Sequence, residues 1–179
     1  MKAVLDACVL YPNVLREILL GVAAQKGFAP LWSARILGEW QHAAARLGPE
    51  GAAIASGEIA LLRAGWPGAE IAPDACLEAR LWLPDPADAH VLATAISAGA
   101  ELIITLNLRD FPARALVAEG VRAQSPDAFL MSLWLEDPER VEASVRAAHA
   151  RTEVASRRAQ DLRALLKRAR LPRLGKALS

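Results

Sequence analysis

The feature that most limits the fold is a continuous aliphatic and β-branched run over residues 102–105, directly after a helix-like segment that ends at Gly99. Such a run is typical of a strand that is buried on both faces of a parallel sheet. Neighbouring parallel strands need a crossover connection, which is usually a helix. We therefore expect strands and helices to alternate around this segment.

The rest of the chain shows the same alternation. Further strands are expected over residues 2–5, over residues 29–32 and near Val121. Helices are expected after Pro12, after Ser33, over residues 51–64, after Asp85, after Pro112, after Ser125, and as a pair from Asp137 to about Leu171. Residues 70–84 give no clear pattern. The sequence predicts an α/β sandwich with a central parallel sheet, whose ligands bind outside the carboxyl ends of the strands.

The chain has 179 residues, of which 54% are hydrophobic, and this fits one compact domain with an additional segment at one end. Its apolar runs are far shorter than the roughly 20 residues that span a bilayer. Asp6 falls within the stretch that would have to be apolar in a secretory signal. We therefore expect a soluble, cytoplasmic protein that does not enter a membrane.

Charge is divided unevenly along the chain. Residues 1–139 carry 10 Lys and Arg against 17 Asp and Glu, whereas residues 140–179 carry 11 against 3. The basic tail includes Arg157, Arg158, Arg163, Lys167, Arg168, Arg170, Arg173 and Lys176. This tail either meets nucleic acid phosphates or an acidic partner, or forms a solvated helix face against the acidic body.

Cysteine and histidine give no metal-binding pattern. Cys8 and Cys76 have neither metal-ligand nor redox spacing, and the three histidines lack the spacing of a zinc site. We interpret Cys8, which follows the first expected strand, as a small buried hydrophobic residue.

Four acidic residues each lie beside an apolar segment: Asp6, Glu39, Asp88 and Asp110. Taken singly, each has a routine explanation as a cap, a helix-dipole partner, a turn residue or a surface glutamate. Asp85 is spaced as the N-cap of the helix that carries Asp88. Together, however, acids at one rim of a parallel sheet repel one another unless a cation compensates them. Oxygen ligands of this kind favour Mg²⁺ or Mn²⁺.

The chain resembles the PIN-domain family, best known as the toxin half of VapBC toxin–antitoxin pairs. The resemblance rests on VLDACVL at residues 4–10, on Ser33 with Glu39, and on PDPADAHVLATAISAGAELIITLNLRDFP at residues 84–112. It covers roughly residues 1–130, which we expect to form a three-layer α/β/α nuclease domain. Residues 131–179 would form a helical, basic C-terminal extension.

The resemblance implies a metal-dependent endoribonuclease, with Asp6, Glu39 and Asp88 as the first three acids of its Mg²⁺ or Mn²⁺ site. Many relatives carry an aspartate at the position of Asn107, so we expect Asp110 to be the fourth acid, and the number of metal ions stays open. Thr105, Asn107 and Asp85 would support the site. Arg109 would either contact the scissile phosphate or remain a solvated loop residue.

The resemblance also implies an RNA substrate, a protein antitoxin and a homodimer. Two alternatives remain. One is a PIN fold that serves as a non-catalytic RNA-binding or regulatory module. The other is a phosphatase in which Asp6 is the nucleophile, but such enzymes usually carry a second aspartate where this chain has Cys8.

Overall fold

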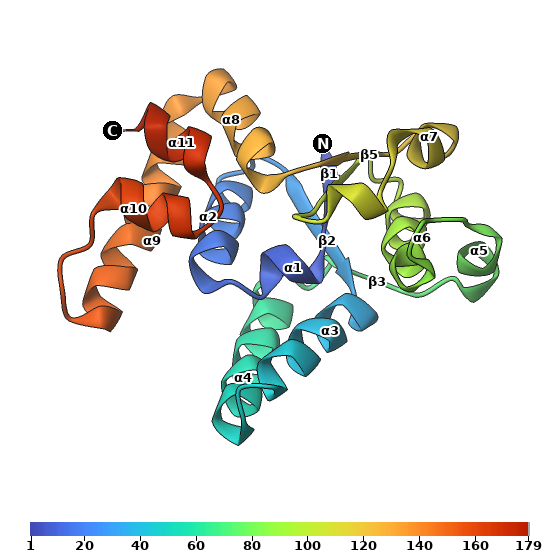
Figure 1. The fold of residues 1–179 in the computed structure, drawn as a ribbon, viewed down its shortest axis with the longest axis horizontal. Coiled ribbons are helices and arrows are strands. Elements are labelled where there is room, and N and C mark those ends of the chain that lie inside the picture. The colour runs from blue at the N-terminus through green and yellow to red at the C-terminus, as the bar shows by residue number, and fades with distance from the viewer. Residues whose placement is uncertain (179) are drawn as a thin grey trace. The chain divides into compact units, whose positions relative to one another are not determined.

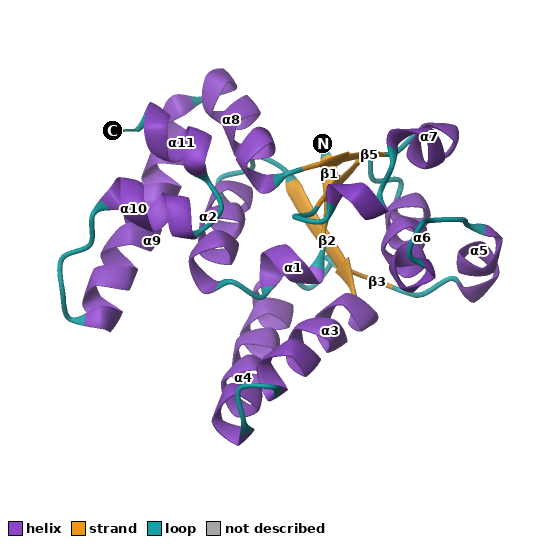
Figure 2. Cartoon of the chain, viewed as in Figure 1, coloured by secondary structure: helices purple, strands orange, loops and turns teal. Residues whose placement is uncertain are grey.

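Five short parallel strands form the sheet of the computed structural model, which describes residues 1–178. They are β1 (Lys2–Leu5), β2 (Ala29–Ser33), β3 (Glu70–Ile71), β4 (Leu102–Ile104) and β5 (Arg122–Gln124). Their order in the sheet is β3-β2-β1-β4-β5, and Figure 2 shows the strands in orange. β1 therefore lies at the centre of the sheet.

The strand order creates a switch point beside β1. The chain moves outward from β1 to β2 and β3, then returns to the opposite side of β1 for β4 and β5. Val4 of β1 lies opposite Leu31 on one side and Ile103 on the other. Ligands of open parallel sheets bind at the carboxyl ends of the strands where the order reverses. This position is the end of β1 and β4.

The chain forms two compact units, and the helices divide between them. The first unit, Met1–Tyr11 with Ala29–Gln124, contains α1 (Ala7–Leu10), α3 (Ala34–Ala45), α4 (Pro49–Gly65), α5 (Ala75–Arg80), α6 (Ala89–Ala98) and α7 (Ala113–Leu116). The second, Pro12–Phe28 with the chain from Ser125 onward, contains α2 (Asn13–Ala24), α8 (Pro126–Glu136), α9 (Pro138–Ser156), α10 (Leu162–Arg168) and α11 (Pro172–Ala177) (Figure 1). The expected α/β class, with its parallel sheet and C-terminal helices, is confirmed.

Local signals explain why the helices of the first unit begin and end where they do. The hydroxyl of Ser33 accepts a hydrogen bond from the backbone N–H of Ile36 and caps α3. α6 ends at Gly99, whose φ of 59° lies in the left-handed region that favours glycine. Val91 and Ala95 of α6 are fully buried, and α6 packs on β1, β2 and β4. Residues 70–84, which gave no pattern, form β3 and α5.

In the second unit, α2 packs against α9. Gly21 of α2 allows a close approach, because a Cβ atom there would lie 3.1 Å from the side chain of Ser144. Gln25 donates a hydrogen bond of 2.8 Å to the hydroxyl of Ser144, and Phe28 packs edge-on against Phe129. The early helix α2 thus belongs with the C-terminal helices. The domain boundary near residue 130 stays a prediction, because compact packing does not test independent folding.

The C-terminal helices extend further than the expected pair. α10 and α11 follow α9, and α11 starts at Pro172, where the sequence analysis placed the end of the helical region. Proline at the first helical position costs no hydrogen bond. The buried carboxylate of Asp127 in α8 accepts hydrogen bonds from the backbone N–H groups of Arg173 and Leu174, at 3.0 and 3.1 Å. Asp127 therefore caps α11 from a distant part of the chain.

No helix between residues 1 and 178 combines the length and apolar character needed to cross a membrane.

Asp127→Asn tests this long-range cap. An amide offers one acceptor oxygen in place of two, so one N–H of α11 loses its partner and we expect a cost of about 1–3 kcal/mol in the free energy of unfolding. Urea unfolding followed by circular dichroism measures the change. Asp161→Asn is the matched control, because Asp161 is an exposed N-cap and asparagine caps a helix as well as aspartate. Equal stabilities of the two variants would contradict the role of Asp127.

Candidate metal centre

Asp6 lies at the carboxyl end of β1, directly beside the end of β4. Its backbone N–H donates a hydrogen bond of 3.1 Å to the carbonyl of Ile104, and its side chain is only 7% exposed. The carboxylate oxygen Oδ2 accepts hydrogen bonds from the hydroxyl of Thr105 at 2.6 Å and from the thiol of Cys8 at 3.1 Å. No residue between 1 and 178 donates to Oδ1. Asp6 is therefore held through one oxygen and keeps the other available.

Cys8 is part of this centre, which the sequence analysis did not foresee. Burial, followed by the charge of Asp6, raises the pKa of the Cys8 thiol to about 12. The thiol therefore stays protonated and donates to Asp6, while its sulfur accepts from the backbone N–H of Leu106 at 3.2 Å. The interpretation of Cys8 as a small buried residue missed this contact, because the residue type alone carries no sign of it.

The loop after β4 links Thr105 to Asp110. The backbone N–H of Asn107 donates to the hydroxyl of Thr105 at 3.0 Å, and the side-chain amide of Asn107 donates to the Oδ2 atom of Asp110. Thr105 and Asn107 thus contact two of the predicted acids. Arg109 in the same loop has a side chain that is 87% exposed, with its Nε atom 3.9 Å from Asp110. This geometry fits a solvated loop arginine.

Glu39 reaches the centre from α3 and contacts a histidine that the sequence analysis left out. Its Oε1 atom lies 2.8 Å from the Nε2 atom of His90, and 4.0 Å from the guanidinium of Arg35. His90 is buried on α6, whereas the side chain of Glu39 is 41% exposed. Since a carboxylate only accepts, Nε2 of His90 is the donor in this bond. The position of His90 next to the buried face of α6 was the signal for its inward placement.

Asp85 caps a short 3₁₀ turn rather than the helix that the sequence predicted. Its carboxylate accepts from the backbone N–H of Ala87 at 2.9 Å, within the turn Pro86–Asp88. Asp88 occupies the N-cap position of α6, but its side chain makes no capping hydrogen bond. Asp85 therefore acts as a cap, as expected, but of the turn that precedes α6. The side chain of Asp88 does not cap α6.

The electrostatics of Asp88 reflect both its burial and the charges of other acids. Its pKa is raised to about 6, first by burial and then by the negative charges of Asp6, Asp85, Asp110 and Glu39. Each of these groups therefore acts on Asp88 at short enough range to disfavour its ionised form. These acids come from separate parts of the chain, and Asp6 lies at the carboxyl end of the sheet.

The residues present suit a hard divalent cation in charge and in donor type. Carboxylate oxygens are the ligands that Mg²⁺ and Mn²⁺ prefer, and a cation would relieve the repulsion around Asp88. Within residues 1–178, however, no three His, Cys, Asp or Glu side chains converge closely enough to bind one ion as they stand. Glu39 and Asp110 are instead paired with His90 and Asn107. The assignment of these acids as metal ligands stays a prediction.

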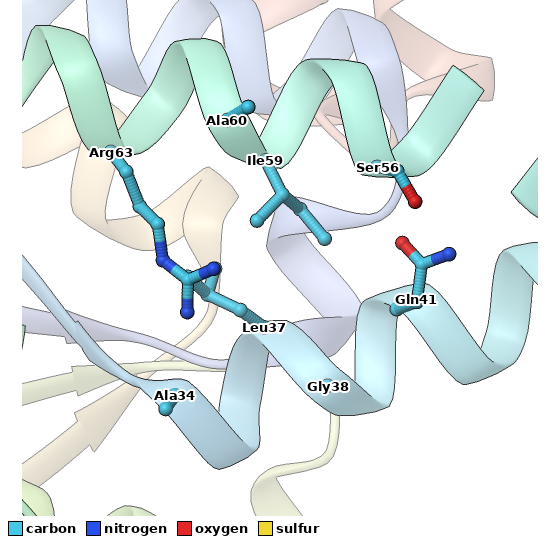
Figure 3. A pocket seen from close by; sticks show the side chains of 8 residues that line it. All are labelled: Ala34, Leu37, Gly38, Gln41, Ser56, Ile59, Ala60 and Arg63. Atoms are coloured by element: carbon cyan, nitrogen blue, oxygen red, sulfur yellow. The ribbon is translucent and has the colours of Figure 1, made fainter. Parts of the chain in front are cut away.

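A separate groove lies between α3 and α4 and takes no part in this centre (Figure 3). It has a volume of about 550 Å³ and is lined by Ala34, Leu37, Gly38, Gln41, Ser56, Ile59, Ala60 and Arg63. None of these residues is acidic, and Arg63 forms an ion pair with Glu70. No carboxylate therefore lines this groove.

Asp88→Asn tests the repulsion at the centre. Because the folded-state pKa of Asp88 is raised from 3.8 to about 6, the folded protein binds the proton more tightly, and stability falls as the pH rises through this window. In EDTA above pH 6, we expect the asparagine variant to melt a few degrees higher than the wild type, and we expect this difference to shrink towards pH 4. The exposed Glu101 provides a control as Glu101→Gln. A variant that is less stable than the wild type at every pH would contradict the repulsion.

Comparison with known proteins places the chain in a family. The chain is 48% identical over 44 residues to the protein named "Putative ribonuclease VapC50" from Mycobacterium tuberculosis (strain ATCC 25618 / H37Rv), a match that covers 25% of this chain and 26% of that relative. The chain thus matches about a quarter of the length of this relative. No solved structure matches the chain. The model of the PIN domain matches residues 2–109, more than half of the sequence, and the chain belongs to the PIN-domain family.

Proposed function

We propose that this protein is a metal-dependent endoribonuclease that hydrolyses phosphodiester bonds in RNA, and that it is the toxin of a type II toxin–antitoxin pair. The observation that carries the proposal is the position of Asp6 where β1 and β4 end side by side, with Asp88 close enough that its pKa is raised first by burial and then by the charges of Asp6, Asp85, Asp110 and Glu39. Crowded carboxylates of this kind are costly for a fold to keep without a cation. An acid whose pKa is raised by burial and by nearby acids is a candidate for a functional site.

Mg²⁺ or Mn²⁺ would bind through Asp6 and Asp88, with Glu39 and Asp110 as the other two acids. When bound, the ion would supply an activated water for hydrolysis and would offset negative charge on the phosphate. Glu39 and Asp110 would either join the ligand set or orient its water molecules, after exchanging their present partners. Asp85 adds a further negative charge that favours cation binding.

The surrounding polar residues would fix the orientation of these acids. Thr105 and Cys8 hold the Oδ2 atom of Asp6, so its Oδ1 atom is the one available for a cation. Asn107 adds a neutral amide where a fourth carboxylate stands in many relatives, and it holds Asp110. Arg109, exposed in the same loop, would approach a phosphate only when RNA is bound.

RNA as the substrate is supported by the membership of the PIN-domain family and by the relative named "Putative ribonuclease VapC50", and the toxin role rests on the resemblance to VapC toxins. A protein antitoxin and a homodimer belong to the same proposal. A non-catalytic RNA-binding or regulatory module is the competing function. A binding module of this kind would need no ionised carboxylates near one another. Here the charges of four other acids act on Asp88.

Asp6→Asn is the central test of catalysis. The variant keeps the shape of the side chain and its hydrogen-bond acceptor, but it removes the charge that would hold the ion. We expect Mn²⁺-dependent cleavage of a panel of structured RNAs to fall by about 100-fold or more, which corresponds to a few kcal/mol of lost transition-state stabilisation.

Circular dichroism should show that the Asp6→Asn variant remains folded, and Glu101→Gln, an exposed change with the same loss of charge, should cleave as the wild type does. Cleavage at wild-type rates by Asp6→Asn would exclude the proposed centre and favour the binding module.

His90 allows a separate test of Glu39. His90→Gln keeps an N–H donor near the carboxylate of Glu39, whereas His90→Leu removes the donor but fills a similar volume. If His90 orients Glu39 for the ion, we expect His90→Leu to weaken Mn²⁺ binding by about 10- to 100-fold and His90→Gln to recover part of it. Electron paramagnetic resonance of free Mn²⁺ measures binding without a cleavage assay. Equal Mn²⁺ affinities of the two variants would show that the hydrogen bond from His90 does not orient Glu39 for the ion.

A further inference from the structure

We infer that the C-terminal helices of the second unit carry a surface that binds the phosphate backbone of RNA, outside the acidic centre. We name it the basic surface and define it as the eight Lys and Arg side chains of residues 157–176, every one of which is exposed. These helices are the orange-to-red end of the chain in Figure 1. The inference rests on the proposed function for the nature of the polyanion.

The basic surface differs from an ordinary solvated helix face in its lack of compensating acids. The one acid among residues 157–178 is Asp161, and its carboxylate accepts a hydrogen bond from the backbone N–H of Ala164. None of the eight cations forms an ion pair within the part of the chain that the structure describes. Earlier in the same unit, Arg146 pairs with Glu142 and Arg151 with Glu17. Charge neutralisation thus stops at the end of α9.

This concentration of like charge has a cost for folding. Arg163 and Lys167 are four residues apart on α10, and like charges at that spacing destabilise a helix. The opposite face of the same segment is apolar, since Leu166, Leu171 and Leu174 are fully buried. The fold therefore holds the cations on the exposed side, where Lys167, Arg168 and Lys176 lie in the last turns of their helices but none of the eight has an acidic partner within the described residues. A bound polyanion would offset the repulsion.

The composition of the basic surface favours a nucleic acid over an acidic protein. Six of its eight cations are arginine, whose planar guanidinium binds phosphate through two parallel hydrogen bonds. Protein interfaces usually have an apolar or aromatic centre. Between residues 157 and 178 no large hydrophobic side chain is exposed. RNA phosphates need no such centre, so RNA is the partner that fits this surface.

The test measures RNA binding without cleavage. Binding of a fluorescent, mixed-sequence single-stranded RNA to the wild type is followed by anisotropy in EDTA over a range of salt concentrations. Each phosphate contact contributes roughly 0.7 to the slope of log affinity against log salt for single strands. We expect Arg163→Gln/Lys167→Gln to make this negative slope shallower by about 1.4, because two phosphate contacts are lost. We also expect binding to weaken about 10-fold or more at low salt.

The matched control is Arg146→Gln/Arg151→Gln, which removes the same charge from cations that already have acidic partners. We expect the control to change the slope little, and we expect both double variants to hydrolyse bis-p-nitrophenyl phosphate as the wild type does. Equal losses of RNA binding in the two double variants would overturn the inference. So would polyglutamate binding as tight as RNA binding, because the partner would then be an acidic protein.

The two proposals fail in different ways. If Asp6→Asn cleaves RNA normally but the slope still depends on Arg163 and Lys167, the nuclease centre fails and the basic surface stands. If cleavage depends on Asp6 while the slope is insensitive to Arg163 and Lys167, the basic surface fails and the centre stands.

Discussion

The parallel pairing of β1 with β4 is the contact on which the acidic centre depends. The hydrogen bond from the backbone of Asp6 to the carbonyl of Ile104 aligns the two strand ends, although the two residues lie far apart in the sequence. With this alignment, Thr105 reaches the carboxylate of Asp6. A shift in register would separate the two strand ends, so the interior packing of Val4 and Ile103 also determines the geometry of the centre.

Around this alignment, the fold places three of the four predicted acids next to a hydrogen-bond donor. Asp6 has Thr105 and Cys8, Glu39 has His90, and Asp110 has Asn107. Asp88 makes no capping bond, and it is also the acid whose pKa is raised. The unequal distribution of donors leaves Asp88 without the capping hydrogen bond that its position would allow.

Local patterns predict most of the first unit, and long-range contacts explain what they miss. The aliphatic runs of β1 and β4, the cap at Ser33 and the stop at Gly99 depend on neighbours in the sequence, so they are readable from it. The same runs predicted where Asp6 and Asp110 lie, because strand ends share one rim. Cys8 and His90 were missed because their roles depend on partners from other elements. α11 was missed for the same reason, since its cap is Asp127.

The grouping of α2 with α9 has a consequence for the order of folding during synthesis. Leu15, Ile18 and Val22 of α2 are buried in the folded protein and emerge early from the ribosome, but α9, against which α2 packs, is completed only after most of the chain has been made. The nascent protein therefore carries an uncovered apolar stripe for most of its translation. Such a stripe is a natural target for holding chaperones, and a message cut short before α9 would yield a product whose α2 never finds its partner.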